Sequence, residues 1–215
     1  MSNTKRNTFL AILALLIVAF LAFGLPRLIG NREEKRVEEP QILSELGKQV
    51  GYEIVKTYPH DADCYTQGLV YEAGTLYESC GLYGQSRLRV VKLESGKSIR
   101  EIDIPEQYFA EGLVLLDDVL TMLTWQEGTA FFYDPSKLKE LGSFNYSTEG
   151  WGLTTDGQSL IMSDGSNTLY WLDPKTGLVV KELHVTLDGH PMQNLNELEF
   201  VNGEILANVY LTDLI

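Results

Sequence analysis

Residues 67–80, QGLVYEAGTLYESC, decide the fold, because the same pattern returns three more times along the chain. The other copies are EGLVLLDDVLTMLTW at residues 111–125, WGLTTDGQSLIMSD at 151–164 and NELEFVNGEILANVY at 196–210. Each copy has an apolar anchor in its third position: Leu69, Leu113, Leu153 and Leu198. A second apolar residue follows seven positions later, after a turn sequence (EAG, DD, TDGQ or NG). Two short apolar runs around such a turn predict a β-hairpin.

Two further strands follow each of the first three hairpins. The third strands are LRVVKL, AFFYD and LYWLD, and the fourth are SIREIDI, LKELGSFNY and VVKELHV, with a Gly or Pro turn between them. The anchoring leucines are 44, 40 and 45 residues apart. Four short strands in each such period are typical of a β-propeller blade. A β-sandwich is the alternative all-β fold, but it does not repeat one four-stranded unit in register.

The two ends of this region depart from the repeat. Residues 52–59, YEIVKTYP, are expected to form a fourth strand whose sheet lacks its first three strands, and the last copy ends inside a blade at YLTDLI. The sequence therefore predicts an all-β domain over residues 51–215. We expect it to be a five-bladed β-propeller that is C-terminally truncated.

Residues 1–30 differ from the rest of the chain. Lys5 and Arg6 precede an uncharged run from Phe9 to Leu25, which spans about 25 Å as a helix and is close to the thickness of a hydrocarbon core. A cleaved secretory signal and an uncleaved signal anchor both fit such a run. The absence of a small-x-small site before Pro26 favours an N-terminal transmembrane helix. We expect a membrane-anchored protein whose domain is exported, to the periplasm or the cell exterior.

Charge and cysteine content add three further expectations. Residues 31–50 are charged and weakly apolar, which is typical of a linker or a short surface helix. The net charge of −13 argues against a nucleic-acid partner, because binding phosphates needs clustered Lys and Arg.

The two cysteines, Cys64 and Cys80, can be oxidised in an exported domain. If the first hairpin turns at EAGT, however, Cys80 lies opposite Gln67, which favours two small buried residues over a disulfide.

The residue two positions before each anchoring leucine changes from copy to copy while its neighbours stay alike. The four residues are an amide, a carboxylate, an indole and a second amide: Gln67, Glu111, Trp151 and Asn196. The innermost strand of a blade lines the central channel, so these side chains are expected to converge near one mouth of it. Such a set fits a ligand site. The alternative is that polar residues line a water-filled channel without binding a ligand.

Aromatic residues fall in the same strands or just before them: Tyr65, Phe109, Trp125, Trp151 and Tyr210. Some of them are expected to fill the core between blades, as aromatic residues in propellers do. A cage of several rings around one carboxylate would be partly dry. Such a cage would raise the pKa of Glu111 and suit it to proton transfer near neutral pH.

Metal and cofactor chemistry has little support in the sequence. His60, His184 and His190 share no metal-ligand spacing, which argues against a zinc site. The stretch SDGSN at residues 163–167 lacks the acidic spacing of a calcium loop and favours a turn. We therefore expect no metal and no cofactor.

A series of motifs resembles the glutaminyl-peptide cyclotransferases of the plant and bacterial type. In order they are YTQGLVY, LYESCGLYGQSRLR, FAEGL, LTW, EGWGLTTDG, LIMSDGS, LYWLDPKTG, LNELEFVNGEILANVY and TD, and the similarity covers residues 52–215. The resemblance implies a five-bladed propeller and an aminoacyltransferase reaction. In that reaction the α-amine of an N-terminal glutamine attacks its own side-chain amide, pyroglutamate forms and ammonia leaves. The implied partners are peptides or proteins with an N-terminal glutamine.

The resemblance also implies roles for individual residues. Glu111 lies in the family's Phe-x-Glu-Gly-Leu motif and would be the catalytic proton shuttle. The implied substrate-binding residues are two amides and five aromatic residues: Gln67, Asn196, Trp151, Trp125, Phe109, Tyr65 and Tyr210. Tyr65 and Tyr210 stand where the family commonly has Phe and Trp, so a ring is kept at both positions. Two other functions stay open at this point, an inactive propeller that binds peptides or protein partners and a metal-dependent, lactonase-like propeller.

Overall fold

The computed structural model describes residues 51–215. The predicted signal anchor, residues 1–30, and the predicted linker, residues 31–50, lie outside the described residues. Every regular element of residues 51–215 is a β-strand. A search of this described part finds no helix with the length and hydropathy needed to span a bilayer.

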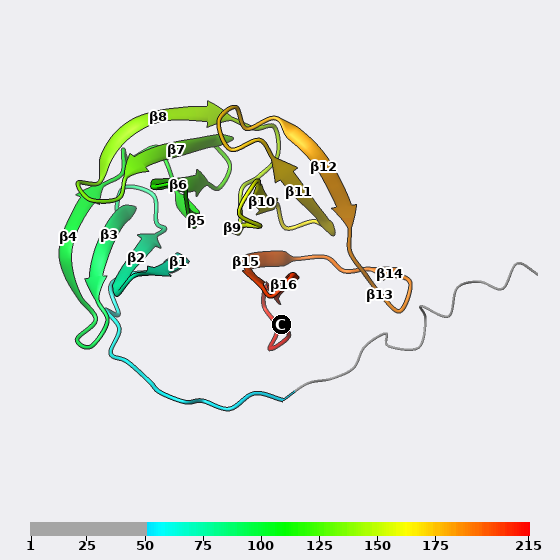
Figure 1. The fold of residues 1–215 in the computed structure, drawn as a ribbon, viewed down its shortest axis with the longest axis horizontal. Helices are drawn as coiled ribbons and strands as arrows, with labels where there is room; N and C mark the ends of the chain where they lie inside the picture. The colour runs from blue at the N-terminus through cyan, green and yellow to red at the C-terminus, as the bar shows by residue number, and fades with distance from the viewer. Residues whose placement is uncertain (1–50) are drawn as a thin grey trace, which may run out of the picture. The chain divides into compact units, whose positions relative to one another are not determined.

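Three antiparallel sheets of four strands follow one another along the chain (Figure 1). The first contains β1 (Thr66–Glu72), β2 (Thr75–Cys80), β3 (Arg87–Lys92) and β4 (Lys97–Asp103). The second contains β5 (Ala110–Leu116), β6 (Val119–Thr124), β7 (Thr129–Asp134) and β8 (Lys139–Asn145). The third contains β9 (Leu153–Thr155), β10 (Leu160–Ser163), β11 (Thr168–Leu172) and β12 (Val179–His184). A small hairpin of β13 (Thr186–Leu187) and β14 (His190–Pro191) then leads to a fourth inner hairpin, β15 (Leu195–Val201) and β16 (Glu204–Val209).

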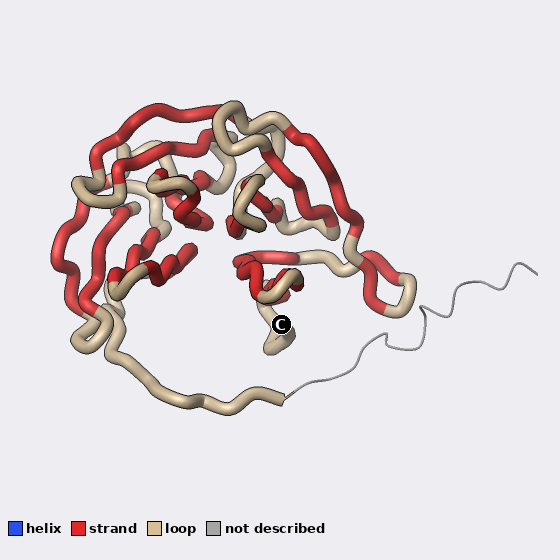
Figure 2. Tube along the Cα trace, viewed as in Figure 1, coloured by secondary structure: helices blue, strands red, loops and turns tan. Residues whose placement is uncertain are grey.

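This arrangement confirms the four-stranded repeat. The strands of each sheet pair in sequence order, and the four inner hairpins turn where the sequence predicts. One predicted strand is wrong: residues 52–59 have no strand structure and form part of the loop drawn before β1 in Figure 2. A strand needs a neighbour that satisfies its backbone groups. No strand of the described residues pairs with this segment.

The inner strands β1, β5, β9 and β15 lie beside one another at the centre of the ribbon in Figure 1. Three hydrophobic clusters fill the spaces between consecutive sheets. The leucine anchors Leu113, Leu153 and Leu198 are buried in these clusters, one in each. Leu69 is 47% exposed, because no sheet of residues 51–215 covers the side of β1 on which it lies.

A glycine before three of the four leucines lets neighbouring inner strands come close together. A Cβ on Gly68 would lie 2.4 Å from the backbone nitrogen of Leu113, and one on Gly112 would lie 2.5 Å from the carbonyl oxygen of Trp151. A Cβ on Gly152 would lie 2.1 Å from the carbonyl oxygen of Asn196. Real Cβ atoms do not approach backbone atoms so closely, so the repeated Gly-Leu pair is a requirement of sheet-to-sheet packing.

A β-bulge interrupts the pairing of three inner strands at the same place in the repeat. The register shifts between Thr66 and Gly68 in β1, between Ala110 and Leu113 in β5, and between Leu195 and Leu198 in β15. A bulge leaves a residue outside the ladder and redirects its side chain. The residues placed in the bulges include Gln67, Glu111 and Asn196.

Hydrogen bonds from the preceding sheet satisfy backbone carbonyl groups at two of these bulges. Ser79 Oγ donates to the carbonyl oxygen of Glu111 at 2.6 Å, and Ser163 Oγ donates to that of Asn196 at 2.7 Å. The backbone N–H of Gly112 donates to the carbonyl oxygen of Trp151 at 2.7 Å. Each bond joins two neighbouring sheets, so it holds the backbone from which a predicted site residue projects.

Cys64 and Cys80 form a disulfide, so the expectation of two separate buried cysteines is wrong. The reason is the bulge in β1. The extra residue places Cys80 opposite Thr66 instead of Gln67, and the two cysteine Cα atoms are 5.1 Å apart. Cα separations of about 4.4–6.8 Å are usual for disulfides.

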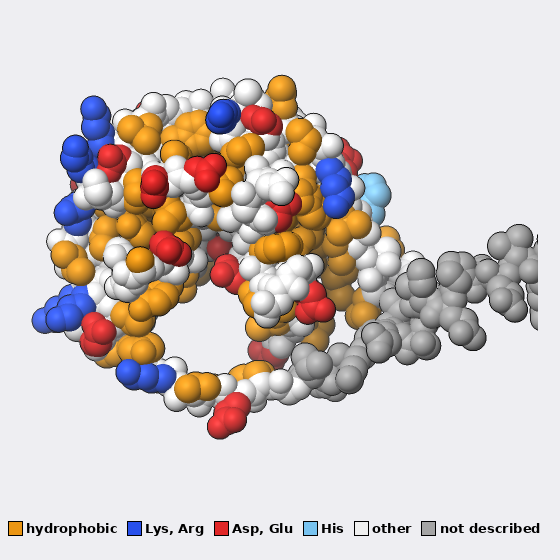
Figure 3. Space-filling view, viewed as in Figure 1, with side chains coloured by type: hydrophobic (Ala, Val, Ile, Leu, Met, Phe, Trp, Pro, Cys, Tyr) orange, Lys and Arg blue, Asp and Glu red, His pale blue; other side chains and the backbone are white. Residues whose placement is uncertain are grey.

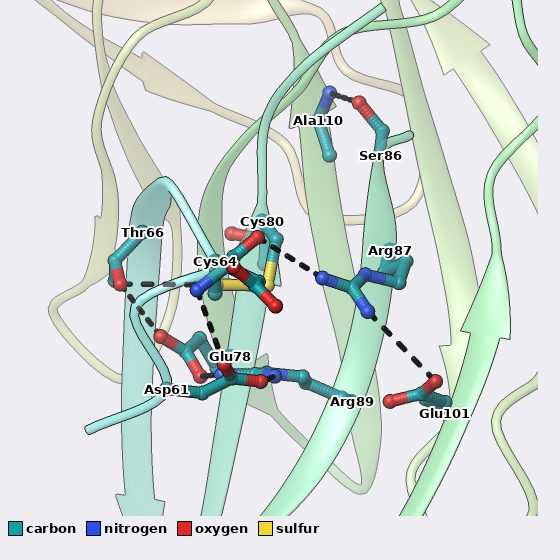
Figure 4. Close-up of a disulfide and its surroundings, with 12 residues drawn as sticks. Asp61, Cys64, Thr66, Glu78, Cys80, Ser86, Arg87, Arg89, Glu101 and Ala110 are labelled. Carbon is teal, nitrogen blue, oxygen red and sulfur yellow. Dashed lines mark hydrogen bonds and ion pairs between the residues drawn. A yellow bond between two sulfur atoms is a disulfide. The ribbon is translucent and has the colours of Figure 1, made fainter. Parts of the chain in front are cut away.

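A buried ion pair lies next to this disulfide (Figure 4). Arg89 donates from Nε to Glu78 at 2.9 Å and from Nη1 to Asp61 at 2.7 Å, and Thr66 Oγ1 donates to Glu78 at 2.6 Å. Arg89 and Glu78 are both fully buried. Together with the disulfide, these bonds fix the start of β1, where Gln67 lies, and the chain just before it, where Tyr65 lies.

Removal of the disulfide is expected to lower the free energy of unfolding by about 3 kcal/mol, the value for closing a loop of this length. The two cysteines are 16 residues apart. Urea unfolding with and without reductant measures the difference. A Cys64→Ala, Cys80→Ala double variant should unfold like the reduced protein and show no response to reductant. A reduced protein as stable as the oxidised one would contradict the expectation.

Candidate functional site

A cavity of about 240 Å³ opens at the inner strands. Its lining consists of the eight residues that the sequence singled out: Tyr65, Gln67, Phe109, Glu111, Trp125, Trp151, Asn196 and Tyr210. The structure therefore brings every predicted site residue to one place. Their roles in catalysis and substrate binding stay a prediction. In the space-filling view, acidic side chains stand among hydrophobic ones around the inner strands (Figure 3).

Each of the four inner hairpins contributes to this lining. Gln67, Glu111 and Asn196 project from the bulges of β1, β5 and β15, and Trp151 lies just before β9. The repeat explains the convergence, because equivalent positions of consecutive sheets face the same centre. The packing between sheets uses the leucine that follows and, in three of the four copies, the glycine before it, so the identity of each of these four residues is free to serve chemistry.

Aromatic rings form two groups in the wall of the cavity. In the first, Phe109 meets Trp125 edge to face with ring centroids 5.7 Å apart, and Tyr65 approaches the same Phe109 at 6.4 Å. In the second, Trp151 meets Tyr210 edge to face at 5.6 Å. These are the favourable geometries for aromatic pairs. Tyr65 and Tyr210 both line the cavity, and the Tyr210 hydroxyl together with burial raises the pKa of Tyr65.

The sequence did not single out Tyr83 and Glu127. Tyr83 adds a ring to the first aromatic group, and Glu127 accepts hydrogen bonds from two of its members. The Tyr83 ring lies 5.3 Å from Phe109 and 6.4 Å from Trp125. Its hydroxyl donates to Glu127 at 2.7 Å, and Glu127 also accepts the backbone N–H of Phe109 at 3.3 Å. Partial burial and the bond to Glu127 raise the pKa of Tyr83 to about 12. Both residues lie in loops outside the hairpin repeat, where no periodic signal could reveal them.

Glu149 lies behind two of the lining residues, and the sequence did not reveal its importance. Its carboxylate accepts hydrogen bonds from the indole N–H groups of Trp125 and Trp151. A signal for it existed in the sequence: an acidic residue stands two positions before Trp151, just outside the register of the four site positions. The sequence could not show that the two tryptophans share this partner, because they belong to different sheets.

Glu111 is the one carboxylate among the eight residues that line the cavity, and it is buried, with 7% of its surface exposed. Burial, together with the negative charges of Glu127 and Glu149, raises the pKa of Glu111 to about 9. The side chain is therefore protonated at neutral pH. A carboxyl group whose pKa lies near or above neutrality can both give and take a proton under physiological conditions.

The raised pKa of Glu111 makes the fold less stable as the pH rises. Between the ordinary value of 4.5 and about 9, the folded protein keeps a proton that the unfolded chain has released. Since the folded state binds more protons over this range, the free energy of unfolding falls with rising pH and levels off above the folded pKa.

Glu111→Gln removes this titration, so the variant is expected to gain stability relative to the parent as the pH is raised from 5 to 9. Thermal unfolding of both proteins across this range measures the difference between their Tm values. Groups that do not interact with Glu111 titrate alike in both proteins and cancel in that difference. A Tm difference that stays constant from pH 5 to 9 would contradict the raised pKa.

Glu197 occupies the repeat position that carries glycine in the other three copies. Its Oε2 atom is buried and has no hydrogen-bond partner among residues 51–215. Burial, followed by the charges of Glu111 and Glu199, raises the pKa of Glu197. Glu197 is therefore a second carboxyl with a raised pKa, next in sequence to the lining residue Asn196.

One group of potential metal ligands lies together within the described part of the chain: His60, Cys64 and Glu78. Cys64 offers no thiolate, because its sulfur is bonded to Cys80. Glu78 is already paired with Arg89. The group thus belongs to the structural cluster beside the disulfide.

Comparison with known proteins identifies relatives of the whole chain. A family model described as glutamine cyclotransferase matches residues 29–215. The glutaminyl-peptide cyclotransferase of Arabidopsis thaliana is 39% identical over 216 residues, which cover 99% of this chain and 66% of the relative. The chain thus spans slightly less than two thirds of the length of that relative.

Solved structures agree with this. The crystal structure of Myxococcus xanthus glutaminyl cyclase is 36% identical and matches with a TM-score of 0.70, covering 74% of this chain and 68% of the other. The WD40 domain of Neurospora crassa Pan2 is 12% identical with a TM-score of 0.53, covering 70% of this chain and 45% of that one. The latter likeness concerns the fold alone.

Proposed function

Because the chain belongs to the glutamine cyclotransferase family, we propose that it is a glutaminyl-peptide cyclotransferase. This enzyme is an acyltransferase that converts the N-terminal glutamine of peptides and proteins to pyroglutamate and releases ammonia. One observation carries the proposal: Glu111 is buried, its pKa is raised to about 9, and it lines a cavity with two amides and a wall of aromatic rings. That combination suits a reaction in which protons move between two nitrogen atoms.

The proposed reaction needs no proton acceptor other than Glu111. The neutral α-amine of the substrate attacks the side-chain carbonyl carbon, and a nitrogen–carbon bond forms. Glu111 gives its proton to the amide nitrogen, so the carbon–nitrogen bond breaks and ammonia leaves. The resulting carboxylate takes a proton from the ring nitrogen and returns to its starting state. An α-amine has a pKa of about 8, so the reactive neutral form is available near neutral pH.

The other lining residues have roles that follow from their chemistry. Gln67 and Asn196 each offer both a donor and an acceptor, which suits hydrogen bonds to the carboxamide or backbone of the substrate. The rings of Phe109, Trp125 and Trp151 exclude water and hold the chain in the curled conformation from which the amine reaches the carbonyl. Tyr65 and Tyr210 complete the same wall.

The size of the cavity limits what it binds. Its volume of about 240 Å³ lies below the range of about 300–1,000 Å³ that is usual for drug-sized ligands. We therefore propose that it takes the terminal glutamine alone and leaves the rest of the peptide outside. A broad range of peptides with an N-terminal glutamine would then be substrates.

We also propose an architecture and a location for the protein. The family resemblance supports a five-bladed propeller, to which the described residues contribute three four-stranded sheets and the β15–β16 hairpin. The apolar run from Phe9 to Leu25 supports a signal anchor in the membrane with the domain exported. The Cys64–Cys80 disulfide agrees with an oxidising compartment outside the cytosol.

The test of the proposed function is ammonia release from a dipeptide that begins with glutamine. Its product should be the pyroglutamyl dipeptide, seen by mass spectrometry as the loss of one ammonia. A dipeptide that begins with asparagine is the matched control, because its shorter side chain would have to close a strained four-membered ring. Binding of the glutamine peptide without ammonia release would contradict the proposal and indicate a binding protein.

A further inference from the structure

We propose that Glu149 is a positioning residue that holds the indoles of Trp125 and Trp151 in one fixed arrangement through a single carboxylate oxygen. Trp125 Nε1 donates to Glu149 Oε2 at 2.7 Å, and Trp151 Nε1 donates to the same oxygen at 2.9 Å. The other oxygen accepts a bond from Gln126 Nε2 at 3.2 Å. This inference deepens the proposed function and rests on it, because both indoles wall the cavity.

Glu149 connects two sheets and two groups of rings. Trp125 follows β6 in the second sheet, whereas Trp151 precedes β9 in the third. Trp125 belongs to the aromatic group of Phe109, and Trp151 forms the other group with Tyr210. On the tryptophan side of the cavity, the Glu149 carboxylate joins these two groups. Loss of this carboxylate removes the hydrogen bonds that link the two indoles, so each indole can change its orientation independently of the other.

The backbone on both sides of Glu149 is held in place. The N–H of Gly150 donates to the carbonyl oxygen of Trp125 at 2.8 Å. Tyr146 accepts the N–H of Thr124 at 3.0 Å and donates to the carbonyl oxygen of the same residue. A Cβ on Gly150 would lie 2.3 Å from the Tyr146 hydroxyl, so only glycine fits there. The carboxylate therefore approaches the indoles from a fixed direction.

The charge state of Glu149 suits this role. Partial burial opposes ionisation, but the hydrogen bonds from Trp151, Trp125 and Gln126 outweigh it and lower the pKa of Glu149. The ionised carboxylate is a stronger acceptor than a neutral group would be. A displacement of about 1 Å in a substrate-positioning group can cost about 10²-fold in rate. Loss of the shared oxygen is therefore expected to reduce catalysis although Glu149 does not line the cavity.

The experiment separates position from charge by comparing Glu149→Ala with Glu149→Gln. An amide oxygen has two lone pairs and can accept both indole N–H groups, whereas alanine accepts neither. We expect Glu149→Ala to lower kcat/KM for a glutamine dipeptide by about 10²-fold, mainly through kcat, because the misplaced indoles no longer hold the curled substrate. Glu149→Gln should restore most of that loss. Equal losses in both variants, or no loss in Glu149→Ala, would overturn the proposal.

Asp156 supplies a matched control elsewhere in the fold. Its carboxylate accepts the indole N–H of Trp171 at 3.1 Å, and neither residue lines the cavity. Asp156→Ala should therefore lower stability and leave kcat/KM unchanged. Glu127→Gln removes a carboxylate that neighbours Glu111 but binds no indole. If Glu127→Gln and Glu149→Ala have the same effect on kcat and its pH profile, the role of Glu149 is its charge and the proposal fails.

A spectroscopic measurement tests the same inference without relying on activity. The chain has three tryptophans, so Trp171→Phe leaves only Trp125 and Trp151 to give the near-UV circular dichroism of indole. In this background Glu149→Ala should weaken that signal, and Glu149→Gln should retain it. An unchanged signal in Glu149→Ala would overturn the proposal.

The spectroscopic measurement does not depend on the proposed function. If the parent protein releases no ammonia, the proposed function fails, while the circular dichroism still decides the role of Glu149. Glu149→Met replaces the alanine variant if the latter does not fold.

Discussion

Ammonia release from N-terminal glutamine is expected to fall by about 10²–10⁴-fold when Glu111 is replaced by Gln, the usual worth of a positioned proton-transfer group. The amide has nearly the shape of the carboxyl group but cannot give a proton to the leaving nitrogen or take one back. The cavity keeps its walls, so the loss should appear in kcat, with KM close to that of the parent protein. Steady-state ammonia release at several dipeptide concentrations separates the two constants.

The matched control for this variant is Glu140→Gln, which makes the same chemical change at an exposed position of β8. It should leave kcat and KM unchanged. Thermal unfolding shows whether Glu111→Gln is folded, and its Tm relative to that of the parent should be higher at pH 9 than at pH 5. A kcat within tenfold of the parent value would show that another group moves the protons.

The second large effect is expected on stability, from Gly112→Ala. The added Cβ would lie 2.5 Å from the carbonyl oxygen of Trp151, 2.6 Å from the nitrogen of Leu153 and 2.7 Å from the carbonyl carbon of Gly152. All three are backbone atoms, so no side chain can rotate away to make room. The second and third sheets must separate locally, which is expected to cost about 3 kcal/mol, the upper end of the usual range for overpacking. Urea unfolding measures the loss.

Gly51→Ala is the control for Gly112→Ala, because no atom lies within 4 Å of a Cβ at Gly51. Its free energy of unfolding should match that of the parent. Gly112→Ala should also lower activity, since Gly112 follows Glu111 in the same bulge. Parent-like stability in Gly112→Ala would mean that the sheets are packed less closely than the structure indicates.

The sequence predicted the repeated part of the fold well because its signals are local. Each hairpin turn lies between two apolar runs, and the same order of strands recurs three times. The four site positions were predictable for the same reason, since a residue at an equivalent place in each repeat faces the same centre. Residues 52–59 were predicted wrongly, because an extended apolar segment resembles a strand whether or not a pairing partner is present.

The remaining features depend on contacts that no repeat encodes. The bulge in β1 moves Cys80 by one position relative to Cys64, and counting outward from the turn cannot detect a bulge. Glu127 and Glu149 lie in loops, and their partners come from other strands or from a neighbouring sheet. The raised pKa of Glu111 was expected from its aromatic neighbours, but the contribution of these two carboxylates depends on three-dimensional placement.

The bulged inner strand has a consequence for how such a protein can be altered. Close packing of the sheets depends on the leucine and, in three of the four copies, on the glycine before it, whereas the residue before this pair lines the cavity. If Gln67 and Asn196 bind the substrate as proposed, substitutions at these two positions are expected to change which terminal residue is accepted, with little loss of stability. A library of variants at these two positions alone is therefore expected to yield folded proteins with altered specificity.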